Sequence, residues 1–144
     1  MKPPYVVNSK IFTVKTIKTY FISVTLFFLV SSVFGSKNIS AYSPIFYAVF
    51  GPTFLFGLHY RLVFNFSSYV GKNAPDLMKK HSISYGILKG NLLNILDVYQ
   101  SQKAFKALKD ERIDAYLQTG ILLLKLVIAS FAMLIVMGIL SAIY

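Results

Sequence analysis

Three long apolar runs constrain this chain of 144 residues more than any other feature of its sequence. They cover residues 19–35, 44–60 and 119–143, and each is long enough for a helix to cross the hydrocarbon core of a bilayer. Charged residues make up only 14% of the chain, compared with about 25% in soluble domains. The sequence therefore predicts an all-α integral membrane protein with three transmembrane helices.

The distribution of basic residues predicts how these helices are oriented. Four lysines lie in the N-terminal segment 1–18 and nine lysines or arginines lie in the loop 61–118, whereas the link 36–43 has one. Basic residues concentrate on the cytoplasmic side of a membrane. We therefore expect the N-terminus and the large loop to be cytoplasmic and the link to lie outside. A bacterial inner membrane is the expected location, and the mitochondrial inner membrane is the alternative.

Two features inside the apolar runs have structural consequences. Gly51 and Pro52 interrupt the second run, and proline removes a helical hydrogen bond, so we expect a kink there. Lys125 lies about 9 Å into the third run, counted from Thr119 at 1.5 Å per residue. Its side chain is expected to extend back to the cytoplasmic surface. The alternative for this lysine is an ion pair with a partner protein or a lipid phosphate.

The large loop is expected to contain a basic amphipathic helix over residues 91–117. Its apolar face contains Ile95, Val98, Phe105, Leu108 and Tyr116. Such a helix either lies on an anionic membrane surface or docks its apolar face on a protein. The cations expected to contact lipids or a partner are Arg61, Lys103, Lys106, Lys109, Arg112 and Lys125.

A stripe of small residues on the third run is a candidate surface for helix packing. It consists of Ser130, Gly138 and Ala142. Small side chains let neighbouring helices approach closely in a membrane. The stripe predicts contact either with a partner helix or with the first two runs of the same chain.

Few residues in this chain are suited to chemistry. The absence of cysteine excludes disulfides, thiolate metal sites and cysteine nucleophiles. His59 and His81 are not spaced as a pair of metal ligands. The acidic side chains of the loop lie among lysines, as on a solvated face, and are Asp97, Asp110, Glu111 and Asp114. We therefore expect no catalytic residue, metal or cofactor. Nucleic acid is not an expected partner, because the basic residues flank apolar runs.

The half of the chain from Asn73 onward resembles the universal stress protein B family of small bacterial inner-membrane proteins. The resemblance rests on Asn73-x-Pro75-x-Leu77, a polar helical stretch, the run Asp110-Glu111-Arg112-Ile113 and a C-terminal apolar run. It implies an inner-membrane protein of poorly defined role and supplies no catalytic residues. This chain differs in having two apolar runs before the loop, where the family has one.

The expected function is that of a non-enzymatic accessory subunit, which stabilises a larger membrane protein complex. The expected partners are other membrane protein subunits and anionic lipids. One alternative is a homo-oligomeric channel or small transporter, whose pathway Gly51-Pro52 and Lys125 would line. Another is a sensor or remodeller of the membrane surface that acts through the amphipathic loop.

Overall fold

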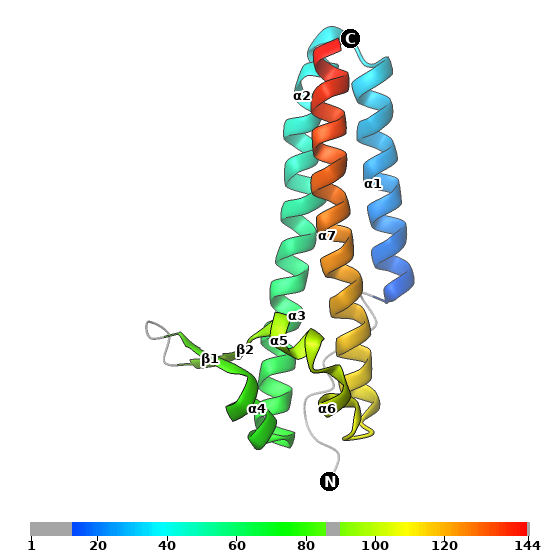
Figure 1. Ribbon diagram of the computed structural model, residues 1–144. Helices are drawn as coiled ribbons and strands as arrows, with labels where there is room; N and C mark the ends of the chain where they lie inside the picture. The colour runs from blue at the N-terminus through cyan, green and yellow to red at the C-terminus, as the bar shows by residue number, and fades with distance from the viewer. Residues whose placement is uncertain (1–12, 86–89, 144) are drawn as a thin grey trace. The chain divides into compact units, whose positions relative to one another are not determined.

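The computed structural model describes residues 13–85 and 90–143, which divide into two compact units. The first unit contains the described residues 13–55 and 126–143, and the second contains those between 56 and 125. Figure 1 shows the succession of helices and strands along the chain.

Three helical stretches of the described chain are long and apolar enough to cross a membrane. They are α1 (Val14–Phe34), the continuous stretch Lys37–Asn73 and α7 (Glu111–Ile143). The prediction of three such helices is therefore confirmed. At most 33% of the residues in the most apolar part of each stretch are buried inside the protein. Most of these residues are thus partly or fully exposed.

The second of these stretches has a π-helical turn in its middle. It consists of α2 (Lys37–Ala48), the π-helical turn η2 (Val49–Thr53) and α3 (Phe54–Asn73). The wider turn includes Pro52, which has no N–H to donate, and it lies where the sequence predicted a kink.

The link expected over residues 36–43 is helical from Lys37 onward. The hydroxyls of two of its serines are satisfied within the helices. Ser40 donates its Oγ–H to the carbonyl oxygen of Ser32 in α1 at 2.6 Å, and Ser43 donates to a carbonyl one turn earlier at 2.9 Å. Because these bonds let serine remain in a helix, only two residues connect α1 with α2.

The prediction of one helix over residues 91–117 is wrong. This part of the chain is divided among the end of β2 (Gly90–Leu93), α5 (Ile95–Gln100), α6 (Gln102–Lys106) and the start of α7 at Glu111. Before it come α4 (Pro75–His81) and β1 (Ser82–Tyr85). The two strands pair antiparallel, with Ser82 opposite Leu93. The backbone N–H of Leu93 also donates to Oγ of Ser67 in α3 at 2.9 Å. The strand pairing and the bond to Ser67 thus use backbone groups that would otherwise form the hydrogen bonds of a helix.

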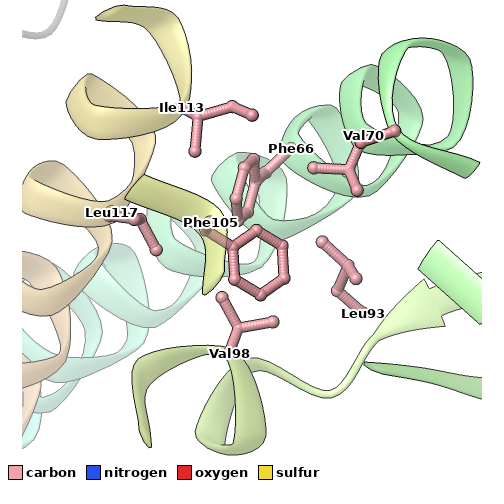
Figure 2. Close-up of a cluster of buried hydrophobic side chains, with 8 residues drawn as sticks. Phe66, Val70, Leu93, Val98, Phe105, Ile113 and Leu117 are labelled. Atoms are coloured by element: carbon pink, nitrogen blue, oxygen red, sulfur yellow. The ribbon is translucent and has the colours of Figure 1, made fainter. Parts of the chain in front are cut away.

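A cluster of buried apolar side chains forms the core of the second unit. Figure 2 shows the side chains from α3, β2, α5, α6 and α7 converging on the rings of Phe66 and Phe105. The remaining members of the cluster are Val70, Ala74, Leu93, Val98, Ile113 and Leu117. Two residues of the predicted apolar face, Val98 and Phe105, are therefore fully buried. Leu108 of the same face is 45% exposed, because the chain leaves the helix after α6.

Lys109, between α6 and α7, has a backbone conformation that favours glycine. Its φ is 50°, which places a non-glycine residue in the left-handed region. We predict that Lys109→Gly raises the free energy of unfolding of this unit by about 0.5–1 kcal/mol. Ala104→Gly within α6 is the matched control and should lower it by about 1 kcal/mol. Hydrogen exchange of the full chain in micelles measures both, and a loss of stability in Lys109→Gly would contradict this assignment.

Candidate functional site

The polar residues of the second unit form three junctions between its elements, of which the first joins α4 to α5. His81 is 4% exposed, and its Nδ1–H donates to Oδ2 of Asp97 at 2.6 Å. The imidazole ring also packs on Phe105, with 5.3 Å between ring centroids. Nε2 of His81 has no hydrogen-bond partner among the described residues. A carboxylate-oriented imidazole can act as a base, but this one is enclosed by the fold and instead holds α4 against α5.

The second junction joins α3, α5 and α7. The hydroxyl of Tyr99 and Nε2 of His59 share a hydrogen bond of 3.1 Å. Burial raises the pKa of Tyr99 well above its ordinary value, so this phenol stays protonated. A methyl group at Gly120 would collide with the same hydroxyl and lie 3.1 Å from Cζ of Tyr99. The absence of a side chain at Gly120 therefore makes room for Tyr99 between the two long helices.

The third junction joins α3 to the start of α7 through Asp110. The hydroxyl of Tyr69 donates to Oδ2 of Asp110 at 2.7 Å, and the backbone N–H of Arg112 donates to Oδ1 at 2.8 Å. The guanidinium of Arg112 lies 5.9 Å from the centroid of the Tyr69 ring, which is within cation–π range. Asp110 therefore caps the first turn of α7 and anchors it to α3.

The ionisation of Asp110 is coupled to this capping. Burial disfavours its charged form, but the hydrogen bonds from Tyr69 and from the backbone N–H groups of Arg112 and Ile113 outweigh burial and lower the pKa of Asp110 below its ordinary value of 3.8. Since the folded-state pKa is the lower one, the stabilisation is present above the ordinary pKa and is lost as the pH falls through the folded-state value.

We predict that acidification below about pH 4 removes less than about 1 kcal/mol of stability through Asp110, because its carboxyl is partly exposed. Asp110→Asn keeps a capping oxygen but does not titrate. The difference in unfolding free energy between the protein and this variant, followed from neutral to acidic pH, isolates the effect. A difference that does not change with pH would contradict the role assigned to the Asp110 charge.

The six cations expected to contact lipids or a partner all belong to the second unit and are exposed. Lys103 and Lys106 lie on α6, Lys109 follows it, and Arg112 lies in the first turn of α7. The other two lie elsewhere, Arg61 on α3 and Lys125 on α7.

In the first unit, hydroxyl groups connect α1 with the second helical stretch. Oγ1 of Thr25 and the hydroxyl of Tyr47 share a buried hydrogen bond of 3.1 Å. The hydroxyl of Tyr20 donates to the carbonyl oxygen of Phe50 in η2 at 2.6 Å. In a π-helical turn, some carbonyl groups lack the hydrogen bond that they would accept in an α-helix. The hydroxyl of Tyr20 donates to one of these carbonyl oxygens.

The three residues of the predicted small-residue stripe differ in how exposed they are. Ser130 is fully buried and donates its Oγ–H to the carbonyl oxygen of Val127, Gly138 is half-buried, and Ala142 is exposed. The stripe is therefore covered at one end by the protein itself and open at the other.

A groove of about 300 Å³ lies between α1 and α2, and its lining is almost entirely apolar. The lining includes Phe27, Phe28, Ile39 and Phe46. Such a groove suits an acyl chain or an apolar side chain rather than a polar substrate.

None of the three polar junctions could have been located from the sequence. The His59–Tyr99 contact joins residues 40 positions apart, and His81–Asp97 joins residues 16 apart. The described residues contain no group of three or more metal-ligating side chains. The candidate site is thus a set of helix junctions flanked by exposed cations. Comparisons with protein-family models, with curated proteins and with solved structures found no match for this chain.

Proposed function

We propose that this chain is an integral membrane protein that serves as a non-enzymatic accessory subunit and stabilises a larger membrane protein complex. In this proposal its partners are other membrane protein subunits, and anionic lipids cover the remaining apolar surface. The N-terminus and the loop 61–118 lie in the cytoplasm, and the membrane is the bacterial inner membrane or, as the alternative, the mitochondrial inner membrane.

The observation that carries the proposal is the uncovered apolar surface of the three long helices. Their exposed side chains include Phe27 on α1, Phe46 on α2 and Ile135 on α7. A stable protein does not leave such helices in contact with water, so lipid and neighbouring proteins are the candidate covers. Packing on a larger complex would use this surface together with the open end of the small-residue stripe.

The folded second unit supports the same function. Its core is closed around Phe66 and Phe105, and its cations remain on the outside. A closed apolar core with a charged exterior is suited to recognition at its surface rather than to enclosing a substrate. This unit would therefore contact polar parts of a complex or lipid headgroups.

The test is purification of the tagged full-length protein in mild detergent, followed by mass spectrometry of the proteins that accompany it. One membrane complex recovered in fixed stoichiometry would support an accessory subunit. A lone monomer that retains no partner would contradict it.

Labelling of single cysteines placed at Lys103 and Lys37 in intact cells tests the orientation, since the natural chain has no cysteine. A membrane-impermeant reagent should reach position 37 and not position 103.

A homo-oligomeric channel is the second candidate, and η2 is the observation that favours it. Carbonyl groups freed by a π-helical turn can coordinate a permeating ion. A stable homo-oligomer whose ion flux in liposomes is lost in Lys125→Leu would favour the channel. Flux that is absent or insensitive to this substitution would count against it.

A further inference from the structure

The short helix α5 contacts both long helices of its unit through one side chain. Tyr99 of α5 bonds His59 of α3 and occupies the space that a side chain at Gly120 of α7 would fill. In the sequence, His59 lies at the end of the second apolar run and Gly120 at the start of the third. Within this unit, α5 therefore lies where both long helices change from polar to apolar sequence.

One large apolar side chain of α5 is left uncovered beside the Tyr99 junction. Val98 is buried in the core with Phe66 and Leu117, which lie on the polar side of His59 and Gly120 along their helices. Tyr99 packs against the same core and bonds His59. Leu96 is three residues before Tyr99 and is 61% exposed, so it lies next to the junction on the surface of the unit.

Two exposed cations lie on either side of this boundary. Arg61 follows His59 by two residues, which places it about 3 Å along α3 toward the polar end, and Lys125 follows Gly120 by five residues, which places it about 7.5 Å along α7 inside the apolar run. Cations at the boundary of a membrane span pair with lipid phosphates, and the flexible stem of lysine lets its ammonium extend toward the headgroups. Exposed aromatic side chains of α3, including Tyr60 and Phe64, accompany them. Aromatic rings of this kind concentrate at membrane interfaces.

We propose that α5 is an interfacial membrane anchor, which inserts Leu96 among the headgroups of anionic phospholipids while Arg61 and Lys125 bind phosphates of the same lipid layer. This inference rests on the membrane insertion proposed above, but not on any partner protein. An apolar side chain beside cations is the pattern by which surface helices bind anionic bilayers. The anchor would fix the depth of the second unit through the Tyr99 junction.

The absence of natural cysteines allows a direct test in the full-length protein. Leu96→Cys carries a spin label in liposomes of phosphatidylcholine and phosphatidylglycerol, and its collisions with oxygen and with a water-soluble nickel chelate are compared. Oxygen concentrates in the bilayer and the chelate in water. We expect the label at 96 to collide more often with oxygen than with the chelate. Labels at Lys80→Cys on α4 and Ile128→Cys on α7 serve as the aqueous and hydrocarbon references.

A label at 96 that matches the aqueous reference at 80, while that at 128 reports lipid, would overturn the anchor and leave membrane insertion intact. Aqueous behaviour at 128 as well would overturn insertion itself. A label at 96 protected from both reagents and broadened by a second spin would show that another copy covers α5, which also overturns the anchor. In Arg61→Gln/Lys125→Gln, the label at 96 should shift toward its aqueous reference, and an unchanged depth would overturn the role of the two cations.

Discussion

Replacement of Phe105 by alanine is expected to lower the free energy of unfolding of the second unit by about 3–5 kcal/mol. The Phe105 side chain is fully buried, and its ring centroid lies 6.0 Å from that of Phe66 and 5.3 Å from that of His81. Helix α6 has only five residues, and Phe105 is its one buried side chain. Removal of the ring therefore leaves a cavity in the core and releases the element that carries Lys103 and Lys106.

Leu108→Ala provides the matched control, because Leu108 is near Phe105 in the sequence but is 45% exposed. Its effect should remain within about 0.5 kcal/mol. Native-state hydrogen exchange of the full-length protein in detergent micelles reports on the second unit separately from the long apolar helices. Similar losses in the two variants would mean that Phe105 does not belong to the core shown in Figure 2.

The contrast between these two residues shows where sequence patterns succeed in this chain. Phe105 and Leu108 lie on one face of the helix predicted from periodicity, and Phe105 is buried as that face requires. Leu108 departs because α6 ends at Lys106, two residues before it. The positive φ of Lys109 then redirects the chain before α7 begins at Glu111, and apolar periodicity reveals neither the helix end nor this turn.

Hydropathy predicted the number of long apolar helices but not where they begin and end. Lys37 and Asn38 make the segment polar, and the sequence therefore predicts a link over 36–43. The carbonyl groups of the helices bind the hydroxyls of Ser40 and Ser43, so the second helical stretch begins at Lys37. The local composition of a segment does not show whether a neighbouring helix will satisfy its polar groups.

The polar junctions depend on tertiary structure alone. His59 is buried and bonded to Tyr99, 40 residues later in the chain. The hairpin likewise depends on Ser67 of α3, whose Oγ accepts the N–H of Leu93. Partners this far apart cannot be paired from spacing in one sequence. These residues nevertheless hold the second unit together and set the position of α5.

Gly120→Ala is expected to destabilise the second unit by about 1–3 kcal/mol, although alanine is the better helix former. The added methyl group would collide with the hydroxyl of Tyr99 and lie 3.3 Å from Cδ2 of Leu62. Tyr99 cannot move aside freely, because its hydroxyl is bonded to His59. Relief of the collision therefore breaks that hydrogen bond or shifts α5 away from α7.

Gly138→Ala in the same helix separates crowding from helix propensity, because a methyl group at Gly138 meets nothing within 4 Å. This control should be neutral or raise the unfolding free energy by up to about 1 kcal/mol.

The Gly120→Ala penalty should also shrink when Tyr99→Phe removes the colliding hydroxyl, so the two substitutions should be non-additive. Thermal unfolding and hydrogen exchange of the four proteins of this cycle measure the coupling. Strictly additive effects would show that Tyr99 and Gly120 do not pack against each other, and α5 would then lose the contact that fixes its level against α7.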